Sequence, residues 1–457
     1  MDKLNITLLG IMSVTGFTGM QACSSERPAI KQPNIVLIMA DDMGKECIGA
    51  YGCTEYKTPN IDRLATQGIR FEHCFSQPLC TPSRVKIMTG LHNFRNYEDF
   101  GYLNPSQVTF ANLLKEAGYA TCVAGKWQLN GLNRNNPGNQ DTSRPYHFGF
   151  DEYCLWQLHH TRAQGERYAD PMITCNGEDL PRNKDAYGPD IFADYVCDFI
   201  GRKAGRPFFV YYPMVLIHDP FVPTPDSPAW QDPERRYEQD TAYVADMMAY
   251  LDKIILKIET ALRDNGVWEN TLFIFTSDNG TKPGVITRTI HGDIEGGKSK
   301  TINTGFHVPM IVTWPDKIRQ GVVSDRLVDF SDVLPTLAEA AAVPADRYTT
   351  DGTSLMDVLL GEQSNKKTEV FMHYSPRWGN NSGKSKHNRL VTDGKYKLYR
   401  NGDFYNTQLD PDERAPLTTF SAEEENIFRR FDGILREKEE HFPFAWNDKE
   451  FRPGGNP

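Results

Sequence analysis

Five runs of consecutive apolar residues interrupt the first two thirds of the chain and predict buried β-strands. They span Asn34–Met39, Tyr119–Ala124, Phe208–Tyr212, Thr271–Thr276 and Val308–Trp314. Runs without polar alternation are typical of strands buried on both faces of a parallel sheet. Helical patterns lie between or after these strands, at Asn60–Gln67, Thr109–Ala117, Thr241–Asn265 and Leu327–Ala341. This alternation predicts an α/β fold with a mostly parallel central sheet flanked by helices.

The pattern changes beyond about residue 350, where apolar stretches become short and turns follow closely. Strands are predicted at 369–374, 388–392 and 396–399, with turns such as Asp393-Gly394, and the segment Phe404–Asn406 and a late helix follow. Short strands joined by such turns are typical of antiparallel pairing. We therefore expect a main α/β domain over residues 33–350. Residues 351–457 should form a smaller C-terminal α+β subdomain on an antiparallel sheet.

The N-terminus has the pattern of a targeting segment. Lys3 precedes the apolar stretch Ile6–Met20, and Gln21-Ala22-Cys23 follows. This resembles a bacterial lipoprotein signal over residues 1–22, cleaved before Cys23, which carries the lipid; residues 23–32 would be a tether. The expected location is then the bacterial cell envelope, as a periplasmic or outer-membrane lipoprotein. The alternative is an ordinary secretory peptide with a chance cysteine.

Charge and cysteine content limit the classes of function. The 457-residue chain has a net charge of −10, which argues against a nucleic-acid partner but leaves room for a local basic pocket. Besides Cys23 and Cys80 there are seven cysteines, without zinc-site spacing. We expect most to be buried and apolar, with oxidation of a pair such as Cys47 and Cys53 left open.

Two pairs of polar residues directly follow predicted strands. Asp41 and Asp42 end the first strand, and Asp278 and Asn279 follow the fourth. The carboxyl ends of parallel strands collect at one edge of a sheet, where ligands bind. Carboxylate and amide oxygens suit a hard cation such as Ca²⁺. Each pair taken alone is more typical of a solvated turn than of a metal site.

The segment Cys80-Thr81-Pro82-Ser83-Arg84 changes that balance. By itself it reads as a buried cysteine before a helix, with Pro in the first turn. Followed by an apolar helix and Thr89-Gly90, however, it resembles the type I sulfatase signature of the alkaline phosphatase superfamily. In that family a separate maturation enzyme oxidises the cysteine to formylglycine (3-oxoalanine). Within that family, the chain resembles bacterial lipoprotein carbohydrate sulfatases.

Other segments match the same family in order and spacing, over roughly residues 33–415. They are Asp41–Gly44, Thr58–Ala65, Gly125–Trp127, Ile217–Phe221, Ser277–Gly280, Gly297-Lys298 and Tyr396–Leu398. The resemblance implies hydrolysis of sulfate esters by glycan-degrading enzymes, and makes residues 33–350 the catalytic domain.

The resemblance also implies a role for each site residue. Asp41, Asp42, Asp278, Asn279 and residue 80 would bind Ca²⁺, in preference to Mg²⁺. A hydroxyl of the hydrated aldehyde would attack sulfur, and the second hydroxyl would later expel sulfate. The resemblance makes Arg84, Lys126 and Lys298 the expected ligands of the sulfate-ester oxygens. His218 or Lys298 would protonate the departing alcohol.

Two departures from the family pattern stand out. Gln128 occupies the position of a family histidine beside the formylglycine, and glutamine cannot take a proton at neutral pH. Residues 302–307 replace the usual Tyr-Glu-Gly-Gly-x-Arg segment. Both weaken the detailed mechanism more than the class.

A sulfated glycan is the expected substrate, and several residues are candidates for reading it. Trp156, His159 and His160 lie in a stretch that could border a sugar, with a surface loop as the alternative. The remaining substrate-binding candidates are Gln128, His291, Arg377, Trp378 and His387. Two other functions stay open: a phosphatase or phosphonate hydrolase of the same superfamily, and a non-catalytic glycan-binding relative with unmodified Cys80.

Overall fold

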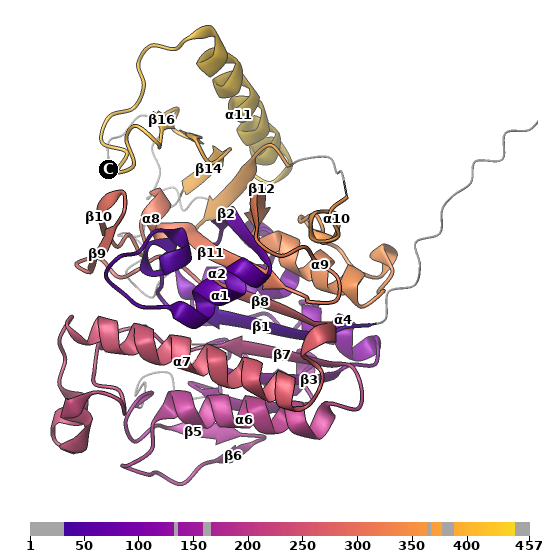
Figure 1. Cartoon of the computed structure of the whole chain (residues 1–457). Coiled ribbons are helices and arrows are strands. Elements are labelled where there is room, and N and C mark those ends of the chain that lie inside the picture. Colours follow the sequence, from indigo (N-terminus) through magenta and orange to yellow (C-terminus); the bar gives the residue numbers. More distant parts are fainter. Residues whose placement is uncertain (1–31, 132–135, 159–165, 363–366, 377–387, 444–457) are drawn as a thin grey trace, which may run out of the picture. The chain divides into compact units, whose positions relative to one another are not determined.

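The computed structural model describes residues 32–131, 136–158, 166–362, 367–376 and 388–443 (Figure 1). A ten-stranded sheet forms the centre, in the order β12-β2-β11-β8-β1-β7-β3-β4-β5-β6. Its strands are β1 (Asn34–Ala40), β2 (Ile69–Phe75), β3 (Ala120–Lys126), β4 (Glu152–Trp156), β5 (Ile173–Cys175), β6 (Glu178–Asp179), β7 (Phe208–Pro213), β8 (Thr271–Ser277), β11 (His307–Thr313) and β12 (Val322–Asp329).

The middle of this sheet is parallel, as the apolar runs predict. β1 pairs in parallel with β7 and β8, and β3 pairs in parallel with β7 and β4. Every residue of β1 is buried, which accounts for its continuous apolar sequence. β11 runs antiparallel to both β2 and β8, so the sheet is mixed. These five parallel strands, β1, β3, β4, β7 and β8, place their carboxyl ends at one edge.

Helices flank the sheet in two packed groups. The first contains α1 (Pro59–Gln67), α6 (Gly188–Lys203) and α7 (Tyr243–Asp264), and α7 packs on both others. This group shares an apolar core with Val36 and Ile38 of β1. The second contains α2 (Cys80–Thr89), α4 (Phe110–Glu116) and α9 (Val333–Ala340), which pack on one another. The helices predicted at 60–67, 109–117 and 241–265 are confirmed within two residues at each end.

The predicted helix at Leu327–Ala341 is wrong in its first part. Leu327 and Val328 belong to β12, which pairs in parallel with β2, and α9 begins only at Val333 after a 3-10 turn. The strand β2 was not predicted because Arg70, Glu72 and His73 interrupt its apolar pattern. These residues sit near the sheet border, where one face is only half-buried.

A separate antiparallel sheet follows, in the order β13-β14-β15-β16, and confirms the predicted C-terminal strands. Its elements are β13 (Val370–Tyr374), β14 (Asn388–Thr392), β15 (Tyr396–Tyr399), β16 (Phe404–Asn406) and the helix α11 (Ala422–His441). α11 begins with a capping box between Ser421 and Glu424 and buries Phe431 and Leu435. Met372 and Leu390 share an apolar cluster with Phe75 and Phe306, so this sheet packs on the main one.

Short elements complete the described chain: α3 (Asn93–Asn96), α5 (Arg144–His147), α8 (Asn303–Phe306), α10 (Met356–Leu359), β9 (Ile286–Thr289) and β10 (Gly292–Glu295). The eight cysteines of the described residues are free thiols. None of the helices in the described part of the chain combines the length and apolar character needed to cross a membrane.

Candidate active site and metal centre

The carboxyl ends of β1 and β8 bring four buried oxygen-bearing side chains together. Ala40 pairs with Ser277 in the parallel ladder, so Asp41 and Asp42 lie beside Asp278 and Asn279. The Asp42 amide donates to Asp278 Oδ1 at 3.1 Å, and Asn279 Nδ2 donates to Asp42 Oδ1 at 2.8 Å. Asp42 holds a φ of 59°, a strained conformation that residues at functional sites often adopt. The two sequence motifs therefore form one acidic centre.

Helix α2 points its N-terminus at this acidic centre. Cys80 is its first residue, and Cys80 Sγ lies 3.4 Å from Asp41 Oδ1 and 3.7 Å from Asp42 Oδ1. The unpaired N–H groups of a helix N-terminus favour negative charge there. Burial and the nearby Asp278 raise the pKa of the Cys80 thiol well above its usual value. An unmodified Cys80 is consequently a neutral thiol.

Arg84 lies one helical turn after Cys80 and braces the carboxylates. Its Nη2 donates to Asp278 Oδ2 at 2.9 Å, and Nη1 donates to the carbonyl oxygen of Lys126 at 3.2 Å. The side chain is 1% exposed and does not line the cavity described below. In this structure Arg84 supports the carboxylates, and its role as a sulfate ligand stays a prediction.

Two lysines that are far apart in the sequence, Lys126 and Lys298, face the acidic centre. Lys126 Nζ donates to both carboxylate oxygens of Asp41, at 2.9 and 2.7 Å, and Lys298 Nζ binds Asp42 Oδ2. Gly125 precedes Lys126 with a φ of 115°, and a Cβ there would lie 2.1 Å from the carbonyl oxygen of Pro213. Only glycine permits this close approach of β3 to β7. The glycine of the Gly-Lys motif thereby positions Lys126.

His218 stands beside Lys298. Its Nδ1 lies 2.6 Å from the carbonyl oxygen of Asp219 and must donate to it, so Nε2 accepts from Lys298 Nζ at 3.1 Å. Burial lowers the pKa of His218 well below its usual value, although Asp41 acts in the opposite direction. Burial acts to lower the pKa of Lys298 as well, but the attraction of Asp42 outweighs the effect of burial. The pKa of Lys298 therefore lies above its usual value. The proton of this pair therefore resides on the lysine.

The acidic centre fits a hard divalent cation. The described residues include one group able to hold an ion, formed by Asp41, Asp42, Cys80 and His218, whose ligand atoms all lie within 4.8 Å of one another. Asn279 Oδ1 is buried and has no hydrogen-bond partner, so it is free to ligate. Burial and Asp41 raise the pKa of Asp278 to about 7, a sign of too little positive charge around these carboxylates. A cation coordinated by oxygen would supply that charge.

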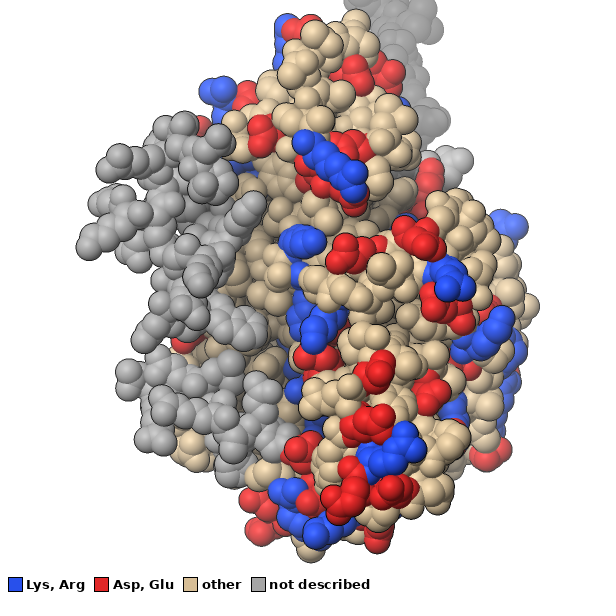
Figure 2. Space-filling model, turned by 90° about the vertical axis from the view of Figure 1, so that its left-hand side faces the viewer, with Lys and Arg blue, Asp and Glu red and all other residues tan. Residues whose placement is uncertain are grey.

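A cavity of ≈ 70 Å³ opens beside Cys80. Lys126, His218 and Lys298 line it with Cys80, and the other lining residues are Phe100, Gln128, Trp156 and Arg167. Figure 2 shows the side of the protein toward which β1 runs in Figure 1, with basic side chains gathered near its middle. The cavity has room for several non-hydrogen atoms, as many as a sulfo group contains.

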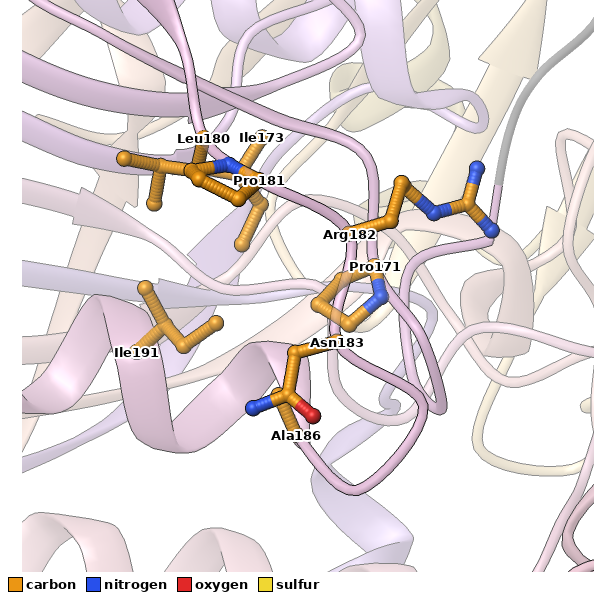
Figure 3. A pocket seen from close by; sticks show the side chains of 8 residues that line it. All are labelled: Pro171, Ile173, Leu180, Pro181, Arg182, Asn183, Ala186 and Ile191. Carbon is orange, nitrogen blue, oxygen red and sulfur yellow. The ribbon is translucent and has the colours of Figure 1, made fainter.

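A larger hollow of ≈ 380 Å³ lies elsewhere, between the segment 171–186 and α6 (Figure 3). Its lining is mostly apolar, with Ile173, Leu180 and Ile191 around it. Its one charged residue, Arg182, already pairs with Asp170. This hollow carries no group able to cleave an ester.

The predicted substrate residues are only partly brought to the cavity. Gln128 lines it, with a φ of 55°. His291 lies in the exposed turn between β9 and β10 and does not line the cavity. The other candidates, His159, His160, Arg377, Trp378 and His387, lie outside the described residues, as does Cys23.

Sequence reasoning missed two lining residues, Phe100 and Arg167. Each stands in a segment without regular secondary structure and without a recognisable motif. Arg167 reaches the cavity because its neighbour Tyr168 is fixed by hydrogen bonds to the carbonyl oxygens of Val215 and His218. Such a long-range contact leaves no local signal in the sequence.

Buried carboxylates, a helix N-terminus and several cations around a small cavity define a site for cleaving an anionic ester. Comparison with known proteins identifies the class. The chain belongs to the sulfatase family, whose model matches residues 33–343. A second model, the C-terminal domain of N-sulphoglucosamine sulphohydrolase, matches residues 298–440. The protein is therefore a type I sulfatase of the alkaline phosphatase superfamily.

Individual relatives agree with this assignment. The chain is 29% identical over 477 residues to N-acetylgalactosamine-6-sulfatase of Canis lupus familiaris, covering 96% of this chain and 86% of that protein. It is 30% identical over 381 residues to arylsulfatase A of Homo sapiens, and the match covers 76% of this chain and 71% of that protein. A solved structure in complex with its substrate D-glucosamine-2-N,6-O-disulfate shares the fold, with a TM-score of 0.70 and 22% identity over 92% of this chain and all of that one.

Proposed function

We propose that this sulfatase hydrolyses sulfate esters on a sulfated carbohydrate, with a formylglycine made from Cys80 as nucleophile and Ca²⁺ at the acidic centre. The observation that carries the proposal is the position of Cys80. It stands at a helix N-terminus, within 3.7 Å of two buried carboxylates, and opens onto a cavity lined by cations. A hydrated aldehyde at this point supplies two hydroxyl groups that a thiol lacks.

The metal proposal follows from the donor atoms. Asp41, Asp42, Asp278 and Asn279 would hold the ion together with an oxygen of modified residue 80. All these donors are oxygens, which Ca²⁺ and Mg²⁺ share as preferred ligands. Ca²⁺ is favoured because it accepts the larger and less regular oxygen set. When bound, the ion eases ionisation of a hydroxyl and offsets the negative charge of the carboxylates.

The cavity residues then have separate tasks. Lys126 and Lys298 line it with their charges and would hold the sulfo oxygens. Lys298 carries a proton, and its hydrogen-bond partner His218 can receive one at Nε2. We assign protonation of the departing oxygen to this pair, because a proton given up by Lys298 can be replaced through His218. Arg84 keeps Asp278 in place.

Gln128 takes the place of the family histidine at the cavity. Its Oε1 is buried without a hydrogen-bond partner. Glutamine can orient a hydroxyl of residue 80 or of the substrate, but it cannot accept a proton at neutral pH. We therefore expect Gln128→His to be tolerated and to change the pH dependence of sulfate release more than substrate binding.

A carbohydrate substrate is supported by the relatives. The names of the matched curated protein and of the C-terminal domain model both refer to sulfated amino sugars. Structures of shared fold include one bound to a disulfated glucosamine. The sulfated sugar and the position of its sulfate would be found by a screen of sulfated mono- and oligosaccharides.

The decisive experiment uses protein produced together with a formylglycine-generating enzyme. Mass spectrometry of the peptide containing residue 80 should show loss of the sulfur atom. We expect Cys80→Ala to lower turnover of an aryl sulfate by at least about a thousandfold, because the nucleophile is gone. An intact thiol in protein that shows no turnover would instead favour a glycan-binding relative.

The reaction class is tested by comparing matched aryl esters. The same matured protein is assayed with 4-nitrophenyl sulfate and 4-nitrophenyl phosphate. Faster cleavage of the sulfate is expected, and faster cleavage of the phosphate would support the alternative of a phosphatase or phosphonate hydrolase.

We also propose an envelope location through lipid at Cys23. The support is the sequence of residues 1–23 alone, which lies outside the described residues. Labelling of expressing bacteria with a palmitate analogue should mark the wild-type protein and leave Cys23→Ala unmarked. Labelling of neither form would favour an ordinary secretory peptide.

A further inference from the structure

We propose that Arg167, stacked on Trp156, recognises a second anionic group, a sulfate or a carboxylate, on the alcohol part of the substrate. This inference rests on the proposed function and gives it a substrate class: sugars that carry an anion beside the ester to be cleaved. Arg167 belongs to no sequence motif identified above.

The side chain of Arg167 is held in place by packing. The guanidinium carbon lies 4.2 Å from the centroid of the Trp156 ring, and only 7% of the residue is exposed. Stacking on an aromatic face fixes the plane of the guanidinium and leaves its edge free to donate. The backbone is fixed as well, since the Tyr168 hydroxyl donates to carbonyl oxygens of the segment after β7 that contains His218.

Among the described lysines and arginines that line the cavity or contact its carboxylates, Arg167 has no carboxylate partner. Within the described residues, Lys126 pairs with Asp41, Lys298 with Asp42, and Arg84 with Asp278. Arg167 has no such ion pair there, and its Nη1 is buried without a hydrogen-bond partner. A buried cation without a counter-charge is costly, unless a ligand supplies that charge.

The position of Arg167 selects the alcohol part of the substrate. Cys80 and Lys126 define the end of the cavity where sulfur reacts, and Lys298 with His218 serves the departing oxygen. Arg167 lines the same cavity next to the His218 segment, with Gln128 and Trp156 around it. Gln128 Oε1 is buried without a hydrogen-bond partner as well, so unused donors and acceptors meet where a sugar substituent would enter.

The chemistry of the ligand follows from these groups. A planar guanidinium with a free edge suits sulfate or carboxylate oxygens, which accept two parallel hydrogen bonds. A neutral sugar hydroxyl would leave the charge uncompensated. The aromatic face of Trp156 is already covered by Arg167, so a sugar ring stacked on that face is not expected.

The test compares esters that share a leaving chromophore. The probes are 4-nitrophenyl sulfate and its 2-carboxy and 3-carboxy derivatives, assayed with matured, calcium-loaded protein. We expect the wild type to have a higher kcat/KM for at least one carboxylated ester. Arg167→Gln should lower that preference by about 10- to 100-fold, since a charge-assisted hydrogen bond is lost. Arg167→Lys should restore part of it.

Arg182→Gln is the matched control, because it removes an arginine charge that lies outside the cavity, and it should keep the preference. Thermal melts show whether each variant is folded. Equal loss for all three esters in folded Arg167→Gln would mean that Arg167 serves the scissile sulfo group or the packing of Trp156, and would overturn the inference. Absence of any preference in the wild type would overturn it too. Failure of the wild type to cleave 4-nitrophenyl sulfate would instead contradict the proposed function itself.

Discussion

Helix α2 lies between two buried groups of charges that differ in what they bind. The reaction cluster, on the side of Cys80 and Arg84, consists of Asp41, Asp42, Asp278, Arg84, Lys126 and Lys298. The anchor cluster, on the side of Lys86, consists of Lys86, Asp329, Asp332 and Lys367.

The anchor cluster is held together by ion pairs between its own members and by backbone amides. Lys86 faces Asp329, Lys367 faces Asp332, and Asp332 also accepts from the amides of Asp329 and Thr353. The reaction cluster keeps polar atoms such as Asn279 Oδ1 without a partner, next to a cavity. The same kind of buried ion pair thus fixes α2 on one side and prepares a binding site on the other.

The largest expected effect is on stability, in the anchor cluster. Lys86→Met leaves Asp329 buried without its cation, and we expect a loss of about 3 to 5 kcal/mol in the free energy of unfolding, measured in urea. Adding Asp329→Asn should recover part of this loss, because the uncompensated charge is removed. A loss below about 1 kcal/mol would show that the anchor cluster does not hold α2.

The next effect is on catalysis, in the reaction cluster. Lys126→Met should lower kcat/KM for an aryl sulfate by roughly 10²- to 10³-fold, as expected for the loss of one preorganised charge at the sulfo group. With Ca²⁺ present, its unfolding free energy should change far less than that of Lys86→Met, since the ion also neutralises Asp41. A Lys126→Met protein that is strongly destabilised but still active would contradict the assignment of Lys126 to catalysis and of Lys86 to stability.

Removal of the metal should also separate the two clusters. At a Ca²⁺ concentration about a hundred times its Kd, chelation should lower the free energy of unfolding by about 2.7 kcal/mol and stop turnover. Thermal melts with and without chelator measure this change. Lys86→Met should keep the response and Asp278→Asn should lose most of it. An unchanged melting temperature after chelation in the wild type would contradict a metal at the acidic centre.

A smaller effect is expected from pH at the anchor cluster. Burial, with a contribution from Lys86, lowers the pKa of His92 to about 4, although Asp329 and Asp351 act against this shift. Below pH about 6.5 the unfolded chain takes up a proton that folded His92 refuses, so stability falls as the pH drops toward 4. Lys367 is a further cation that lowers the pKa of His92.

Between pH 7 and pH 5 we expect a loss of about 1 to 2 kcal/mol from His92. Denaturation curves at both pH values measure it, and His92→Asn should reduce the difference. Half-buried His218 and buried His307 also have lowered pKa values, so part of the pH dependence should persist in that variant. Identical curves for wild type and variant would exclude His92 as a source.

The strands that carry the site were predictable because burial on both faces requires uninterrupted apolar residues. β1, β3, β7 and β8 all follow this rule, and their polar ends marked Asp41, Lys126 and Asp278. β2 escaped prediction because it lies near the sheet border, where charged residues are allowed. The misread residues Leu327–Asp329 pair with that same strand, so a single missed partner accounts for the missing strand and for the misread start of the helix.

The apolar runs and motifs along the chain are enough to show which chemical groups are present and which edge of the sheet collects them, since strand burial and motif order are local properties. Tertiary structure decided which of the charges are paired. Arg84 turned out to brace Asp278, His291 to lie on an exposed turn, and Arg167 to enter the cavity with a free edge. Pairing depends on distances between residues far apart in the chain, and ion pairs leave no periodic signal along it.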